Sequence, residues 1–191
     1  MTKLVEDIGG LTSLVKENDP ILKKVAEKFD FENPIVDPEE LSESLQFLRA
    51  AGGAIGLAAN QIGLSTRVMC IGMGNFSTEG TEEYQQTFFN PDILHYEGDE
   101  VYMIEGCLSF PGLSVEVKRP TTIFMKWEDE KGNPFNEKFE GITSRIIQHE
   151  YDHLMGITMD KKANRFHLER AKKKRRLLAK AQSPRRIQSA K

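Results

Sequence analysis

The sequence has few of the features that mark secreted, membrane-embedded or repetitive proteins. It contains two cysteines and one tryptophan among 191 residues, which excludes a small disulfide-stapled scaffold and indicates a reducing compartment. No apolar run approaches the roughly 20 residues of a membrane-spanning helix. The first residues, Met1–Asp7, form no apolar signal-peptide segment, and repeats and low-complexity segments are absent. We therefore expect a cytoplasmic protein that does not enter a membrane.

The sequence does contain enough apolar residues for one hydrophobic core. Hydrophobic residues make up 39% of the chain. At 191 residues the chain is long enough for one good core and too short for two domains. Charge divides the chain unevenly. Residues 161–191 hold 13 Lys or Arg and one acid, Glu169, whereas residues 1–160 hold 13 Lys or Arg and 28 Asp or Glu. This division predicts a single acidic domain over residues 1–160, followed by a basic C-terminal helix and tail over residues 161–191.

The basic C-terminal stretch has two interpretations, and the sequence leaves both open. Asn164–Ala181 is expected to be a helix with a thin apolar stripe, and its charges can simply be solvated. Alternatively, dense Lys and Arg on one element is typical of contact with the phosphates of RNA.

The pattern most informative about chemistry is His149-Glu150-Tyr151-Asp152-His153. Two histidines four residues apart lie on one face of an α-helix, so their ring nitrogens can reach a single divalent ion. Glu150 lies to the side of that face where an activated water would stand. Together these residues are the minimal set for metal-assisted hydrolysis. Such short patterns also arise by chance on solvated helices, so a third ligand is needed.

Candidates for the third ligand lie on both sides of this motif. Met159 occupies the position at which a longer form of the motif has a third histidine, and a thioether is a poor ligand for such ions. Glu169 could serve, although it lies in the basic stretch. Cys107, predicted to lie in a turn or at a strand end, could supply a thiolate and leave the fourth position to water. A buried free thiol is the plainer interpretation of Cys107, as it is of Cys70.

A third segment, Gly53–Gly63, is rich in glycine and alanine. Small residues let a backbone approach a ligand closely and leave main-chain groups free to pair with an extended peptide. Gln61 adds an amide that can donate to a developing oxyanion. Alone, such a segment is equally consistent with a tight packing contact or a simple loop.

Local patterns predict an α+β fold, with mainly antiparallel sheets around a central metal-binding helix, N-terminal helices and the basic C-terminal helix. The helices before that C-terminal one are expected at Pro20–Phe29, Asp37–Ala51 and Ile142–Leu154. In the last of these, Thr143 or Ser144 is the expected cap and Gly156 the stop. The strands are expected at Arg67–Met73, Thr87–Phe89, Ile93–Glu100, Thr121–Trp127 and Phe135–Phe139.

Taken in order, the three segments resemble the peptide deformylase family. That family carries G-x-G-L-A-A-x-Q, then E-G-C-L-S, then Q-H-E-x-x-H. The corresponding stretches here are Ala54–Gln61, Glu105–Ser109 and Gln148–His153, and the resemblance covers most of the chain. Two positions depart from the family pattern: Ala54 replaces a glycine, and Ser114 stands where many members carry arginine.

The resemblance implies a metal-dependent hydrolase that removes the N-terminal formyl group from formyl-methionine of nascent polypeptides and releases formate. It implies Fe²⁺ as the cofactor, with Zn²⁺ or Ni²⁺ replacing it in preparations. The implied metal ligands are Cys107, His149 and His153. The implied catalytic groups are the Glu150 carboxylate as the proton carrier, and the Gln61 amide and Leu108 backbone N–H as oxyanion donors. The implied substrate-binding residues are Ile55, Gly56, Met103, Gly106, Ile142, Arg145 and Ile146.

The same resemblance bears on partners. In that family a C-terminal helix docks on the ribosome, which suits the basic residues 161–191. The expected substrates are N-formylmethionyl nascent peptides, and the expected assembly is a monomer. Because every implied catalytic residue precedes Asp160, the basic stretch is not expected to affect turnover of a short peptide.

Three other functions stay open at this point. A zinc endopeptidase would use Glu169 as third ligand in place of Cys107. A ribosome- or RNA-binding module would hold a structural metal, with all four positions filled by protein ligands. A structural protein would bind no metal.

Overall fold

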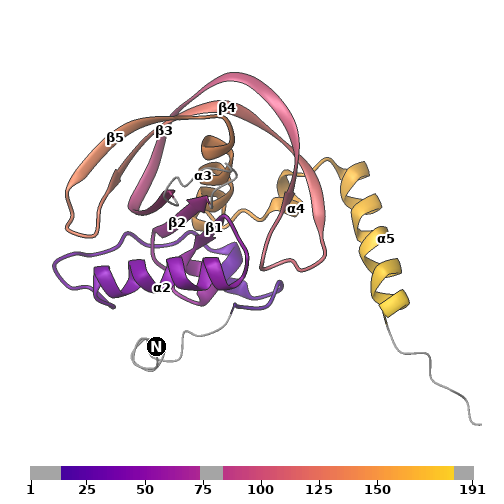
Figure 1. The fold of residues 1–191 in the computed structure, drawn as a ribbon, viewed down its shortest axis with the longest axis horizontal. Coiled ribbons are helices and arrows are strands. Elements are labelled where there is room, and N and C mark those ends of the chain that lie inside the picture. The colour runs from indigo at the N-terminus through magenta and orange to yellow at the C-terminus, as the bar shows by residue number, and fades with distance from the viewer. Residues whose placement is uncertain (1–13, 74–83, 183–191) are drawn as a thin grey trace, which may run out of the picture.

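The structure, a computed structural model, describes residues 14–73 and 84–182 (Figure 1). Over these residues a five-stranded antiparallel sheet curves around helix α3, Gly141–Leu154 (Figure 1). The strands are β1 Gly56–Ala58, β2 Val68–Met73, β3 Tyr84–Gly106, β4 Ser114–Glu128 and β5 Pro134–Glu140. The sheet order is the chain order, β1-β2-β3-β4-β5. The predicted α+β fold with antiparallel strands around a central helix is confirmed.

Strand β3 joins two predicted strands into one long, bent strand. Thr87–Phe89 and Ile93–Glu100 both lie in β3, and its pairing with β4 shifts register between Phe89 and Asp92, between Ile93 and His95, and between Glu97 and Glu100. Such bulges bend and twist a strand. Asn90, at the first shift, has a φ of 47°. The bends let the β3–β4 ribbon arch over α3 instead of continuing flat (Figure 1).

Helix α2, Pro38–Ala51, forms as predicted. The Asp37 carboxylate accepts hydrogen bonds from the backbone N–H groups of Glu39 and Glu40, at 3.0 and 3.1 Å. It therefore satisfies donors that the first helical turn leaves unpaired. The smaller helical turns are η1 Pro20–Lys23, η2 Ala59–Ile62 and α4 Met159–Lys162. The C-terminal helix, α5, spans Arg165–Gln182, close to the predicted range.

The predicted helix over Pro20–Phe29 is wrong, because only its first four residues are helical, as the 3₁₀ turn η1. Beyond that turn the chain is held to distant backbone. The N–H of Ala26 donates to Leu154 O at 2.8 Å, and the N–H of Arg67 donates to Glu27 O at 2.7 Å. These long-range pairings replace the helical bonds that the apolar spacing suggested.

The C-terminal end of α3 was predicted correctly from the sequence, and its N-terminal end was not. The expected caps, Thr143 and Ser144, are wrong: the N-cap is Glu140, without a side-chain hydrogen bond, because Gly141 at φ 60° turns the chain directly from β5 into the helix. The expected stop is confirmed. Gly156 has a φ of 70°, and its N–H donates to His153 O at 3.0 Å.

Three buried clusters hold these elements together. One lies between the sheet and α3 and includes Phe88, Ile123, Met125, Ile147 and Leu154. A second packs α2 against β1 and β2 and includes Leu41, Leu45, Leu57 and Phe89. The third, which we call the turn cluster, consists of Phe110, Leu113, Val115, Val117 and Met159. Among the helices in the described ranges, none combines the length and apolarity needed to cross a bilayer.

Candidate metal centre and its pocket

The fold brings three predicted metal ligands together. Helix α3 presents His149 and His153 on one face, and Cys107 begins the turn that joins β3 to β4. Their ligand atoms lie within 4.8 Å of one another, and the Cys107 Sγ is 3.2 Å from His153 Nε2. Within the described residues this is the one group of three or more His, Cys, Asp or Glu able to hold a metal ion.

A carboxylate fixes the orientation of His149. Its Nδ1 lies 2.9 Å from Glu105 Oε2, so Nε2 is the ring nitrogen left for an ion. A histidine ligand commonly has such a partner, which sets its tautomer and ring orientation. Burial raises the pKa of Glu105, but hydrogen bonds from His149 and Arg119 outweigh it and lower the pKa to about 2. Glu105 is therefore an anion at neutral pH.

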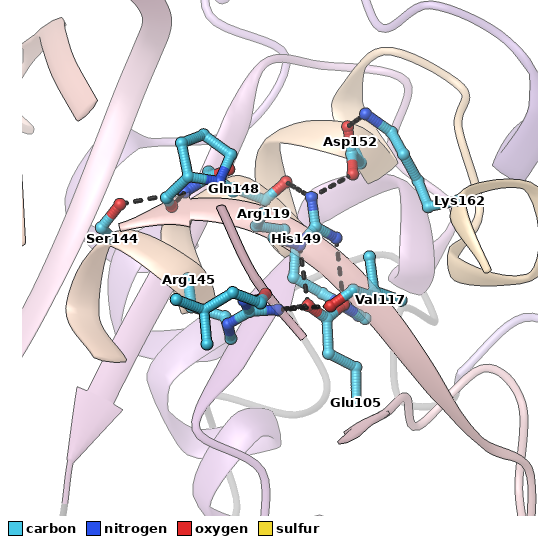
Figure 2. Close-up of polar contacts among 11 residues, drawn as sticks. Glu105, Val117, Arg119, Ser144, Arg145, Gln148, His149, Asp152 and Lys162 are labelled. Atoms are coloured by element: carbon cyan, nitrogen blue, oxygen red, sulfur yellow. Dashed lines mark hydrogen bonds and ion pairs between the residues drawn. The ribbon is translucent and has the colours of Figure 1, made fainter. Parts of the chain in front are cut away.

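Glu105 belongs to a buried network of charges behind the ligands (Figure 2). Arg119 on β4 pairs with Glu105 Oε1 at 2.7 Å and with Asp152 Oδ2 at 2.6 Å. Arg145 pairs with the same Glu105 oxygen at 2.8 Å, and Lys162 pairs with Asp152 Oδ1 at 3.1 Å. One guanidinium, that of Arg119, therefore links the carboxylate that orients His149 to the residue that precedes His153.

Glu150 lies beside the ligands with one oxygen unpaired. Its side chain is buried, and its Oε2 has no hydrogen-bond partner among the described residues. Burial raises the pKa of Glu150 to about 7, a shift that a nearby cation would oppose. A Cβ on Gly56 would overlap this carboxylate, so the glycine of β1 leaves the space that Glu150 occupies.

Gln61 is also held in one orientation. Its Oε1 accepts a hydrogen bond from the Ala58 N–H at 2.8 Å, so its Nε2 must be the end that points toward Cys107. Nε2 lies 3.3 Å from Cys107 Sγ and donates to Ser109 Oγ at 3.1 Å. The amide donor predicted from sequence therefore stands next to the metal ligands.

A cavity of about 560 Å³ opens onto this centre. It is lined by all seven predicted substrate-binding residues: Ile55, Gly56, Met103, Gly106, Ile142, Arg145 and Ile146. Cys107, His149, Glu150, Gln61 and Leu108 line it as well. His153 lies behind them with no exposed surface. The cavity thus places a largely apolar surface beside the candidate metal ligands.

Several site residues have no signal in the local sequence. Arg119 binds partners 14 and 33 positions away, and no motif surrounds it. The wall formed by Ile104, Phe110 and Leu113 was also missed, because these residues look like ordinary strand and turn residues. The roles of Glu105 and Asp152 had a weak signal, since each lies inside a motif that also contains a metal ligand.

The rival third ligand lies elsewhere. The side chain of Glu169 is 62% exposed on α5 and lies 3.7 Å from Lys172, outside the Cys107, His149 and His153 group. Three converging protein ligands that face an open cavity are typical of catalytic sites, whereas structural sites have four protein ligands. The fold and the site together define a hydrolase built around a metal centre.

Comparisons with known proteins make this class specific. The sequence model of the polypeptide deformylase family matches residues 11–169. A peptide deformylase from Cytophaga hutchinsonii is 38% identical over 144 residues, which are 75% of this chain and 77% of that protein. One from Flavobacterium psychrophilum is 33% identical over 170 residues, 84% of this chain and 87% of that protein. The chain therefore belongs to the polypeptide deformylase family.

Solved structures agree with this assignment. The peptide deformylase of Synechococcus elongatus, crystallised with actinonin, has a TM-score of 0.74 and 29% identity, with 85% of each chain covered. The peptide deformylase of Legionella pneumophila has a TM-score of 0.75 and 27% identity, with 90% of this chain and 97% of that one covered. The activity of this chain is metal-dependent removal of the N-formyl group from nascent polypeptides.

Proposed function

We propose that Cys107, His149 and His153 hold the catalytic ion and that Glu150 carries the proton. The donor set fits a divalent ion, because one thiolate and two imidazoles converge and Glu105 fixes the His149 tautomer. When bound, such an ion polarises a carbonyl and lowers the pKa of water. The observation that carries the proposal is the buried, unpaired Glu150 Oε2 among the described residues at the cavity.

In this proposal each neighbouring group has one task. Glu150 accepts a proton from the attacking water and returns it to the departing amine of methionine. The Gln61 amide and the Leu108 backbone N–H donate to the oxygen of the formyl carbonyl as it gains charge. Support comes from the fixed direction of the Gln61 amide, which points toward Cys107.

The cavity accounts for selection of the methionine side chain. We propose that four apolar side chains enclose the thioether, those of Ile55, Met103, Ile142 and Ile146. The stem of Arg145 completes this wall. The Arg145 guanidinium is engaged by Glu105, Val117 O and Val101 O, so it presents its stem and not a free charge. The Ile55 carbonyl accepts the Gly72 N–H at 3.0 Å, so the Ile55 N–H and main-chain groups of Gly56 and Gly106 are the ones proposed to pair with the peptide backbone.

The choice of ion rests on donor chemistry and on the family resemblance. A site with one thiolate and two imidazoles suits Fe²⁺, Zn²⁺ or Ni²⁺, and we propose Fe²⁺ as the cofactor. Metal analysis after anaerobic purification tests this. Iron at about one equivalent, with activity lost on chelation and restored by Fe²⁺, is the expected result.

We further propose that the basic face of α5 contacts ribosomal RNA. The side chains of Lys173, Lys174, Arg176 and Lys180 are exposed, and Figure 1 shows α5 at one edge of the molecule. Clustered exposed cations of this kind bind nucleic-acid phosphates.

A substrate that is a nascent chain implies a cytoplasmic enzyme. A monomer is the proposed assembly, which size-exclusion chromatography with light scattering tests.

Formate release from formyl-Met-Ala-Ser tests the catalytic proposal directly. The metal-loaded protein should release one formate per peptide, and Cys107→Ala should abolish it. Glu169→Ala is the matched control, because it removes the rival ligand from the exposed helix α5. Loss of activity in Glu169→Ala with retention in Cys107→Ala would overturn the proposed ligand set.

A further inference from the structure

The Cys107–Leu113 turn carries two essential parts of the proposed site. It begins with a proposed metal ligand, Cys107, and continues with Leu108, whose N–H is a proposed oxyanion donor. Phe110 and Leu113 line the cavity. Few backbone–backbone hydrogen bonds lie within the turn. The N–H of Phe110 donates to Cys107 O at 3.0 Å, and the N–H of Leu113 donates to Phe110 O at 3.1 Å. The Gln61 amide holds Cys107 and Ser109 from one side, and the position of the rest of the turn depends on what packs behind it.

Helix α5 supplies part of that packing, together with Met159 of α4. The half-buried side chains of Leu168 and Ala171 pack against the turn cluster, which includes Phe110 and Leu113, and Cys107 packs against the same cluster. The apolar residues of the helix and the metal ligand therefore share one buried patch. Residues 167, 168, 171, 172 and 175 of α5 are partly buried, and this spacing is that of a single helix face.

Polar contacts anchor the same face of α5. The stem of Arg175 lies against the turn, because a Cβ on Gly112 would stand 3.6 Å from Arg175 Cγ. The Arg175 guanidinium pairs with Glu17 at 2.8 Å, which ties it to the N-terminal segment. His167 Nδ1 contacts the Glu116 carboxylate of β4. The helix is thus attached on both sides of the turn.

We propose that Leu168, Ala171 and Arg175 are positioning residues for the deformylase reaction, which hold the Cys107–Leu113 turn in its catalytic position. This inference rests on the proposed roles of Cys107 and Leu108. Helix α5 is then part of the catalytic body along its first three turns. From the sequence we predicted that the basic stretch does not affect turnover. In this proposal that prediction applies only to its exposed side chains.

The test compares two leucines of one helix. Leu168→Ala removes apolar contact with the turn cluster, whereas Leu178→Ala changes a side chain that is 50% exposed. The two substitutions change helix propensity equally. Because a displacement of about 1 Å can cost about a hundredfold in rate, a loosened turn should lower kcat of Leu168→Ala by about three- to tenfold. The KM should change less. Leu178→Ala should match the parent.

A second readout needs neither metal nor substrate. In the metal-free protein, the rate at which a disulfide reagent modifies Cys107 reports how firmly the turn is held. Cys70 has no exposed surface, so the early phase of the reaction belongs to Cys107. Leu168→Ala should accelerate that phase by about three- to tenfold, since modification of a thiol depends on its access, and Leu178→Ala should leave it unchanged.

A third variant separates positioning from general loss of stability. Leu168→Met nearly conserves volume and should restore both kcat and the slow thiol reaction. All variants are assayed at least 20 °C below their unfolding midpoints, so that the folded fraction is constant.

Each outcome decides between the proposals. Parental kcat and thiol reactivity in Leu168→Ala would overturn the positioning role. A faster thiol reaction with parental kcat would also overturn it, because α5 would then hold the turn without serving catalysis. If the parent protein itself released no formate, the proposed function would fail, while the thiol rates would still report whether α5 holds the turn.

Discussion

The metal centre and the outer face of α5 use the same cationic residue types in opposite ways. Around the metal centre, Arg119 is 3% exposed and Arg145 is 6% exposed, and both are paired with Glu105. On the outer face of α5, Lys173, Lys174 and Arg176 are exposed to water. A buried ion is costly unless it is paired, whereas an exposed one is screened and contributes little alone. Single substitutions should therefore matter at the centre, and only the sum of charges should matter on α5.

The largest effect is expected at Glu150. Glu150→Gln keeps the shape of the side chain but removes its ability to accept a proton, so deformylation should fall by about 10²- to 10⁴-fold. Metal content should stay near that of the parent, because Glu150 is not a proposed ligand. Steady-state kinetics and metal analysis on the same samples measure both. Retained activity would mean that another group moves the proton.

The next largest effect concerns the buried network. Arg119→Met leaves Glu105 and Asp152 without their shared partner, and such a break typically costs about 3–5 kcal/mol in free energy of unfolding. Urea unfolding measures the loss. The matched control is Lys126→Met, since Lys126 forms an ion pair with Asp92 at 3.2 Å but is 57% exposed. Its expected cost is below about 1 kcal/mol. Similar costs for both variants would erase the contrast between buried and exposed pairs.

Cys107→Ser should then weaken metal binding more than folding. Removal of a residue that only orients a metal ligand typically lowers metal affinity by about 10- to 100-fold. Replacing the thiolate ligand itself by a hydroxyl, which ionises poorly, should lower the affinity at least as much. Competition with a chelator measures affinity, and circular dichroism monitors folding. Cys70→Ala is the control, because this thiol is buried in the cluster that packs α2 against β1 and β2 and does not belong to the Cys107, His149 and His153 group. Parental affinity in Cys107→Ser would exclude it as a ligand.

The smallest effect of one substitution is expected on the outer face of α5. Lys174→Ala should weaken ribosome binding a few-fold and reduce the slope of log affinity against log salt by about one unit. Replacing Lys173, Lys174, Arg176 and Lys180 together by Gln should reduce that slope by several units, because each lost phosphate contact retains its counterion. Co-sedimentation with ribosomes at several salt concentrations measures the slope. A slope unaffected by all four changes would place ribosome contact elsewhere.

Local patterns predicted the placement of site residues well where a single element carries them. The spacing of His149 and His153 depends only on helix geometry, and the stop at Gly156 depends only on its own backbone conformation. The turn at Cys107 was also visible in the sequence, but the strand residues next to it, 101–106 of β3 and 114–120 of β4, were not predicted. In each case the physical determinant is contained within a few consecutive residues.

Features that depend on distant partners could not be predicted from local patterns. The Pro20–Phe29 segment has helical spacing but is held by the backbones of Ser65, Arg67 and Leu154. Arg119 resembles any arginine in a strand until β4 is placed beside β3 and α3. The packing of Leu168 against the turn cluster is of the same kind. Each requires knowledge of which surfaces the sheet brings together.

The order of the strands has a consequence for how the protein is made. Each strand pairs with the one before it in the chain, so the sheet can assemble progressively during synthesis, without waiting for distant partners. Cys107 is in place once β3 and β4 have paired, but both histidines lie on α3, which follows the last strand. In an emerging chain all five strands are therefore synthesised before the two histidines of the proposed metal centre. A chain that has not yet been extended to α3 holds only one of the three proposed ligands, Cys107.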